Sequence, residues 1–151
     1  DPKVGGGRII GEACHFIDVL QFLTDSNPIS LDVNKMSQSE FNDTVTFTMR
    51  FEDGSLGTIH YWSNGPTSFS KERIEVFCQE RIGILDNFKK LQLITNNKTR
   101  NKTFYTSDKG FNNECDQFLR ICKGEENRKN IKTLLINTEI TFKIIDQILN
   151  K

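Results

Sequence analysis

Residues 44–62 read TVTFTMRFEDGSLGTIHYW. Apolar residues alternate with polar ones through the first half of this stretch, which is the period-2 pattern of a strand with one buried face. They are Val45, Phe47, Met49 and Phe51. Asp53-Gly54 supplies the chemistry of a tight hairpin turn. We therefore predict that a strand near 56–62 pairs antiparallel with a strand at 44–51.

A helix and a further strand precede this hairpin. Between Glu12 and Thr24, apolar residues recur at three- and four-residue spacing, which indicates the core stripe of an amphipathic helix. The stripe consists of Ala13, Phe16, Ile17, Leu20 and Leu23. Asp25-Ser26-Asn27-Pro28 ends the helix, because proline biases its predecessor out of the α region. Residues 29–33 return to period 2 and predict a strand.

More strands are expected after the hairpin. Residues 73–78 and 82–86 flank Gln79-Glu80-Arg81 and predict a second hairpin, and a short strand follows at 91–94. The segment 96–110 is polar and basic, so we expect a loop or an irregular edge there.

Two amphipathic helices are predicted at the end of the chain. The first ends near Gly124, and its apolar face consists of Phe111, Cys115, Phe118 and Cys122. The core stripe of the second consists of Ile131, Leu134, Leu135, Thr138, Phe142, Ile145 and Leu149. A helix, about six strands and two helices predict one α+β domain over residues 1–151, with a mainly antiparallel open sheet and helices on one face. The uncovered face must be polar or buried by a partner.

Composition excludes several classes of protein. The 151 residues contain 20 Lys+Arg and 20 Asp+Glu, and this balance lacks the basic surface of a nucleic-acid-binding protein. No apolar run approaches the roughly 20 residues that span a bilayer, and no secretory signal is recognisable. The four cysteines form no CxxC pair, so we expect reduced, mostly buried thiols in a cytoplasmic protein, without zinc or disulfides.

A glycine run opens the chain at Gly5-Gly6-Gly7, and Gly11 follows. A dinucleotide-binding loop would follow a buried strand within a βαβ unit, and that context is not met here. We therefore favour a turn that leads into the helix. Backbone N–H groups at the start of a helix can still meet an anionic or hydroxyl-bearing ligand brought by another domain.

His15 is the first candidate for chemistry. Glu12 lies three residues before it and Asp18 three after, so the three side chains share one sector of the helix. A carboxylate beside an imidazole fixes its tautomer and suits it to general acid–base work near neutral pH. A surface histidine between two solvated charges fits the same spacing. A metal site is disfavoured, because ligands at this spacing drift around the helix.

Trp62 and Lys71 are candidates for ligand binding. Trp62 ends a predicted strand beside the turn Ser63-Asn64-Gly65-Pro66, where an aromatic ring could line a pocket for a sugar. Tyr61 and Trp62 point to opposite faces of the strand, so at least one of them is expected to pack. Lys71, with Glu72 and Arg73, could bind a carboxylate or a phosphate, or form a solvated sheet edge.

The most specific stretch runs from Gly5 to Asp18 and reads GGGRIIGEACHFID. It resembles the opening of the C-terminal domain in the glucose-fructose oxidoreductase/inositol dehydrogenase/rhizopine catabolism (Gfo/Idh/MocA) family. The resemblance extends loosely over the chain, through FEDGS at 51–55, KERIEVF at 71–77 and the two closing helices. It is greatest to the branch fused to zinc alcohol-dehydrogenase-like modules.

The resemblance implies a two-domain NAD(P)-dependent oxidoreductase that acts on sugar or cyclitol hydroxyls. This chain would be its substrate-binding and oligomerisation half, inactive alone and binding no cofactor itself, with a Rossmann domain upstream. His15 matches the family's histidine and Asp18 the acid three residues beyond it. Gly11 stands where the family has an aspartate, Ala13 stands where it has a glycine, and Glu12 is one residue from the acid position.

We therefore expect His15 and Glu12 to be catalytic, with no metal ligand. The side chains expected to bind substrate are Arg8, Asp18, Trp62 and Lys71. A homo-oligomer would form through the open sheet face. The competing hypothesis is a non-catalytic dimerisation module with a decayed site, which Gly11 in the acid position favours.

Overall fold

The computed structural model describes residues 7–37, 43–125 and 131–150. The predicted α+β class is confirmed, and every pair of strands in the described chain is antiparallel. One open sheet of about six strands was expected, whereas the described residues form seven strands in two sheets. These belong to two compact units, residues 1–64 with 128–151 and residues 65–127.

The first unit contains a three-stranded sheet in the order β1 (Pro28–Lys35), β2 (Val45–Phe51) and β3 (Leu56–Tyr61). The predicted hairpin is confirmed, with Phe47 opposite Ile59. Gly54 has a φ of 87° in its turn, a left-handed conformation that glycine adopts without strain.

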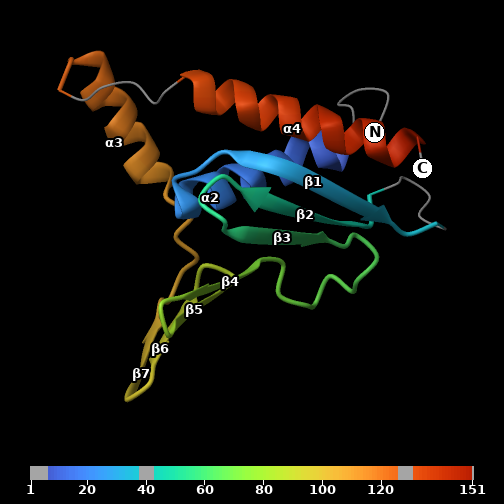
Figure 1. Cartoon of the computed structure of the whole chain (residues 1–151). Coiled ribbons are helices and arrows are strands. Elements are labelled where there is room, and N and C mark those ends of the chain that lie inside the picture. The colour runs from blue at the N-terminus through green and yellow to red at the C-terminus, as the bar shows by residue number, and fades with distance from the viewer. Residues whose placement is uncertain (1–6, 38–42, 126–130, 151) are drawn as a thin grey trace. The chain divides into compact units, whose positions relative to one another are not determined.

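The helices of this unit are a π-helix, η1 (Ile9–Ala13), followed by α2 (Cys14–Thr24) and α4 (Ile131–Asn150). Figure 1 shows α2 and α4 on the same side of the sheet. The buried core lies between these helices and the sheet. It consists of Ile9, Ala13, Ile17, Val33, Val45, Phe47, Met49, Phe51, Ile59, Ile140, Ile144 and Ile148. The opposite face of the sheet is polar, and Thr48 Oγ1 lies 3.1 Å from Thr58 Oγ1 across two strands.

The core stripe predicted for α4 is largely wrong. Leu134, Leu135, Phe142 and Leu149 are all exposed, and only Ile145 of the apolar residues on that stripe packs against the core. The buried face carries Asn137, Ile140, Thr141, Ile144 and Ile148. The helix has apolar residues on more than one face, so periodicity alone admits two stripes, and packing against the sheet selects the isoleucine stripe. The side chain of Ile131 lies outside the described part.

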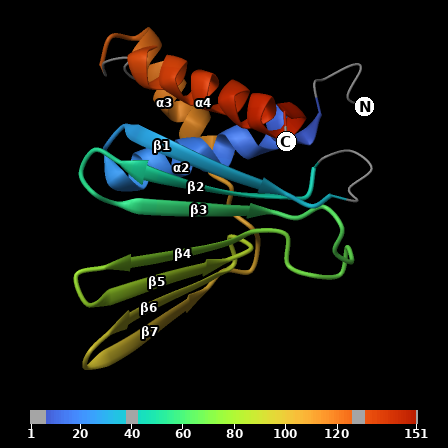
Figure 2. The same ribbon diagram turned by 45° about the vertical axis from the view of Figure 1, so that its right-hand side comes forward.

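The second unit contains a four-stranded sheet in the order β4-β5-β6-β7, visible in Figure 2. Its strands are β4 (Arg73–Cys78), β5 (Arg81–Asp86), β6 (Lys90–Thr95) and β7 (Lys98–Thr103). The hairpin predicted around Gln79-Glu80 is confirmed.

The prediction of a loop or irregular edge at 96–110 is wrong over Lys98–Thr103, which forms β7. Every side chain of β7 is exposed, so the strand has no apolar pattern that could announce it, and backbone pairing with β6 supports it instead.

The first closing helix is α3 (Phe111–Cys122), and Gly124 follows it with a φ of 75°, as predicted. None of its residues is buried. The expectation of mostly buried cysteines is wrong, because Cys78, Cys115 and Cys122 are exposed and Cys14 is half-buried, and all four are free thiols. Among the residues described, no helix is both long and apolar enough to cross a membrane.

Candidate functional site

The π-helix at the start of the chain positions the first candidate site. Ile9 and Ala13 are buried under α4, and this fixes the orientation of the turn. Short π-helical turns occur frequently at functional sites, because the wider turn re-aims side chains. Here the polar residues of the turn, Arg8 and Glu12, each reach a partner from the sheet end.

Glu12 is held by Tyr61 at the end of β3. The Tyr61 hydroxyl donates a hydrogen bond of 2.8 Å to Glu12 Oε2, and both residues are half-buried. Burial raises the pKa of the Tyr61 hydroxyl well above its usual 10.0, and the hydrogen bond to the Glu12 carboxylate raises it further. Tyr61 is therefore a neutral donor at physiological pH, and it fixes the position of the carboxylate.

Arg8 is held by Asp43. Its Nε lies 3.7 Å from Asp43 Oδ2, and Asp43 is only 5% exposed. Ser63 Oγ donates a 2.6 Å hydrogen bond to Asp43 Oδ1 and lies 3.1 Å from Thr44 Oγ1. The Arg8 side chain is 58% exposed, so its guanidinium can meet an anionic or hydroxyl-rich ligand while Asp43 holds it.

His15 lies on α2 with an exposed side chain, and Asp18 is half-buried one turn further on. In the described part of the chain, no hydrogen bond or ion pair is formed by the His15 ring. Glu12 and Arg8 thus share one cluster with Tyr61 and Asp43, and His15 follows on the next turn of the same helix.

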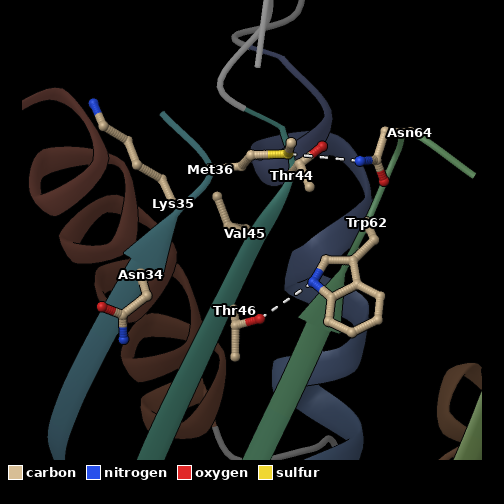
Figure 3. Close-up of a pocket in the computed structure, with 8 residues that line it drawn as sticks. All are labelled: Asn34, Lys35, Met36, Thr44, Val45, Thr46, Trp62 and Asn64. Carbon is tan, nitrogen blue, oxygen red and sulfur yellow. Dashed lines mark hydrogen bonds between the residues drawn. The ribbon is translucent and has the colours of Figure 1, made fainter. Parts of the chain in front are cut away.

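Trp62 is not part of this cluster. Tyr61 pairs with the buried Val45 and so faces the helices, whereas Trp62 faces the opposite side of the sheet, where its Nε1 donates to Thr46 Oγ1 at 3.2 Å (Figure 3). Lys71 is exposed and precedes β4 in the second unit.

The glycine run is only partly described, because Gly5 and Gly6 lie outside the described residues. Gly7 has a φ of 91°, and a Cβ on Gly7 or Gly11 would meet nothing within 4 Å. No described strand pair is parallel, whereas a dinucleotide-binding unit is built on parallel strands. The described strands therefore do not form the parallel βαβ unit of a dinucleotide-binding domain. The described residues also contain no group of three or more His, Cys, Asp or Glu that could hold a metal.

Asp43 and Ser63 could not be assigned from the sequence, because one precedes β2, the other follows β3, and they meet only in the fold. Tyr61 could have been assigned, because the strand alternation places it on the same face as the buried Ile59. Together with Arg8 and Glu12, these residues offer donors, acceptors and one exposed cation, a set that suits a ligand rich in hydroxyl groups.

Solved structures of dehydrogenases have a similar fold. The UDP-N-acetylglucosamine 3-dehydrogenase GnnA from Acidithiobacillus ferrooxidans matches with a TM-score of 0.75 and 15% identity, over 95% of this chain and 48% of that one. The dehydrogenase MviM from Clostridium difficile matches with a TM-score of 0.66 and 16% identity, over 93% and 48%. WlbA from Bordetella pertussis, solved with NADH and UDP-GlcNAcA, matches with a TM-score of 0.57 and 17% identity, over 95% and 43%.

Identities this low demonstrate a common fold and nothing more, and this chain spans about half the length of these structures. The comparison with curated proteins gives no match. The sequence profile of the GFO/IDH/MocA C-terminal domain matches residues 1–82, which include the π-helix, α2 and the first three strands. Since this match covers more than half of the 151 residues, the chain belongs to the GFO/IDH/MocA C-terminal domain family.

Proposed function

We propose that this chain is the substrate-binding and oligomerisation domain of an NAD(P)-dependent sugar or cyclitol dehydrogenase. The observation that carries the proposal is the hydrogen bond between Tyr61 and Glu12, which fixes a half-buried carboxylate one helical turn before His15. The family and the sugar dehydrogenases with a similar fold support the substrate class.

In this proposal His15 accepts the proton of the reacting hydroxyl. Its exposed imidazole is available to a substrate, whereas the Glu12 carboxylate is occupied by Tyr61. Glu12 would orient the substrate or the imidazole, and Asp18 would bind a further hydroxyl. Arg8, held by Asp43, would bind the anionic or polar end of the substrate.

The cofactor belongs to another part of the enzyme in this proposal. The antiparallel strands lack the parallel unit on which a dinucleotide site is built, and this supports a Rossmann domain upstream that would hold NAD or NADP, with the chain alone inactive. The four free thiols support a reducing compartment, the cytoplasm. A fusion to a zinc alcohol-dehydrogenase-like module stays a prediction, as does substrate binding by Lys71.

The catalytic assignment is tested in the complete enzyme that carries this chain. Once UDP-sugars and inositols have been screened for turnover, we expect His15→Ala to lower kcat by about 10²-fold or more with a smaller change in KM. The other histidine, His60, lies on the opposite face of the sheet, so His60→Ala is the matched control. Equal kcat values for His15→Ala and the parent enzyme would contradict the assignment.

A second candidate is a non-catalytic dimerisation module with a decayed site. Gly11 in the acid position and the absence of a described partner for His15 favour it. Full turnover by the His15→Ala enzyme would support this candidate over the first.

Both candidates include self-association through the outer face of β1-β2-β3, whose centre carries Thr48 and Thr58. Sedimentation equilibrium of the chain at micromolar concentration measures this self-association. We expect a dimer that Thr58→Arg dissociates, because an unpaired charge would be buried at the contact. A monomeric parent chain would contradict this assignment.

A further inference from the structure

A polar pocket lies on the outer face of the first sheet, on the opposite side from the Glu12–Tyr61 pair. Its volume is about 380 Å³, and ligand pockets in proteins occupy roughly 300–1,000 Å³. It lies where β1 and β3 end and β2 begins, and Figure 3 shows its lining. The lining side chains that matter here are Asn34, Met36, Thr46, Trp62 and Asn64.

Trp62 has a fixed orientation in this pocket. Its Nε1 donates a 3.2 Å hydrogen bond to Thr46 Oγ1, and the same hydroxyl lies 3.0 Å from His60 Nδ1. The His60 ring packs against the indole with centroids 4.9 Å apart and planes at 43°. Trp62 nevertheless remains 64% exposed. An aromatic surface is therefore held in place before any ligand arrives, which reduces the entropy lost on binding.

Amide groups surround this aromatic surface. The Asn34 side chain lies across β2 from Trp62 (Figure 3), and its Nδ2 donates to Asp32 Oδ2 at 3.0 Å, which leaves its carbonyl oxygen as an acceptor. Asn64 Nδ2 donates only to Met36 Sδ at 3.6 Å, a weak acceptor that a ligand oxygen can replace. The pocket thus offers both a donor and an acceptor beside the indole.

The pocket lacks a cation aimed into it. Lys35 is the one charged residue among the lining residues, and its Nζ donates to the carbonyl oxygen of Ile148 at 2.6 Å, on the helix side of the sheet. A phosphate or carboxylate ligand is therefore disfavoured, whereas a neutral ligand with many hydroxyl groups is compatible with the lining.

We infer that this pocket is a binding site for a neutral pyranose, separate from the proposed reaction site. The apolar C–H face of the ring would stack on the indole of Trp62, and its hydroxyls would exchange hydrogen bonds with Asn34 and Asn64. The pocket lies at the end of the sheet, whereas the surface proposed for self-association is centred on Thr48 and Thr58.

Tryptophan fluorescence tests this inference. Trp62 is the only tryptophan of the chain, so the signal comes from this pocket. The chain is titrated with methyl β-glucoside, N-acetylglucosamine and UDP, and saturation-transfer NMR is recorded on the sugars. We expect a saturable fluorescence change in the millimolar range with either sugar and no saturable change with UDP. The UDP arm distinguishes a pyranose site from a nucleotide site.

Variants then locate the site. Asn34→Ala should weaken sugar binding by about three- to ten-fold, because one hydrogen bond is lost. Trp62→Ala should reduce the saturation transfer, and the part that remains should be lost when Arg8→Ala is added, because Arg8 belongs to the proposed reaction site. Leu135→Gln, an exposed change on α4 outside both proposed sites, is the control and should bind like the parent chain.

Three results would overturn the inference. One is the absence of saturable binding of either sugar. Another is parent-like binding by Asn34→Ala together with Trp62→Ala. The third is a sugar-induced fluorescence change that is lost in the Thr58→Arg chain, since this would make the signal a report on the contact between two copies. Circular dichroism shows whether each variant is folded, and Trp62 and Asn34 are exposed, so both substitutions should be tolerated.

Discussion

Tyr61 and Trp62 are neighbours in the sequence and have opposite surroundings. Tyr61 faces the helices and donates to Glu12, whereas Trp62 faces the outer side of the sheet and donates to Thr46. The strand geometry alone separates the two side chains, since successive residues point to opposite faces. One strand end thereby serves two polar sites.

The Tyr61 hydrogen bond should make the parent chain more stable than the Tyr61→Phe variant, and this difference in the free energy of unfolding should depend on pH in the alkaline range. The folded-state pKa of Tyr61 is raised above 10.0, so below about pH 10 the hydroxyl is protonated in both the folded and unfolded chains. Above that pH the unfolded chain loses the proton first, and stability falls as pH rises. Tyr61→Phe should lower the free energy of unfolding by about 1 kcal/mol at neutral pH. This gap between the parent chain and the variant should shrink above about pH 10.

Urea unfolding of both chains between neutral pH and about pH 11 measures the gap. Tyr105 is present in both and cancels in the comparison. A gap that stays constant through the alkaline range would show that Tyr61 does not keep its proton in the folded state.

The site was only partly predictable at this scale. Arg8, Glu12 and His15 belong to one local stretch whose spacing and family resemblance indicate them directly. Tyr61 lies 49 residues from Glu12, and Asp43 meets Ser63 only after β2 and β3 have paired. Contacts of this kind depend on strand register, which a single sequence does not specify.

The packing of α2 on β3 depends on Gly57. A Cβ at this position would lie 2.7 Å from Leu20 Cδ1 and 3.0 Å from Leu20 Cδ2. We expect Gly57→Ala to destabilise the chain by about 1 kcal/mol, because the end of the Leu20 side chain would have to shift out of its packed position. The double variant Gly57→Ala/Leu20→Ala should cost less than the sum of the two single changes.

Thermal and urea unfolding give the free energies of unfolding of the two single variants and the double variant. Gly65→Ala is the matched control, because a Cβ there meets nothing within 4 Å. Strict additivity of the two changes would contradict the close approach of Leu20 to Gly57.

The positions of most helices and strands could be predicted from the sequence, whereas the buried face of a helix could not always be. Residues 44–62 gave the central hairpin correctly, because alternation and a turn motif agree there. In α4 two apolar stripes compete, and nothing in the sequence says which one meets the sheet. In β7 there is no apolar stripe at all, so the strand is recognisable only from its pairing with β6.

The two stripes of α4 differ in their expected mutational cost. Ile144 is fully buried, so Ile144→Ala should cost about 2–5 kcal/mol, because it leaves a cavity between helix and sheet. Leu135 is 64% exposed, and Leu135→Gln should change the free energy of unfolding by no more than about 0.5 kcal/mol. Urea unfolding of the two variants shows which of the two apolar stripes of α4 packs against the sheet. A larger loss for Leu135→Gln than for Ile144→Ala would restore the stripe expected from the sequence.

At the scale of the whole molecule, the two units differ in how they bury side chains. Twelve apolar residues form the buried core, and all of them belong to the unit of residues 1–64 and 128–151. Within residues 65–125 no described residue is buried, although each neighbouring pair of strands there is hydrogen-bonded along its length. Since backbone pairing contributes less net stability than apolar burial, the two sheets should open with different free energies.

Native-state hydrogen exchange tests this difference with a matched pair of strands. β2 and β5 are both flanked by a strand on each side, so their amides have equivalent hydrogen-bonding positions. They differ in burial, because Val45, Phe47 and Met49 of β2 are at most 1% exposed and no residue of β5 is buried. We expect amides of β2 to exchange at least about ten-fold more slowly than those of β5, with the edge strand β7 faster than either. Equal protection in β2 and β5 would mean that both sheets open together in one cooperative event, and that apolar burial in the first unit does not set their relative stability.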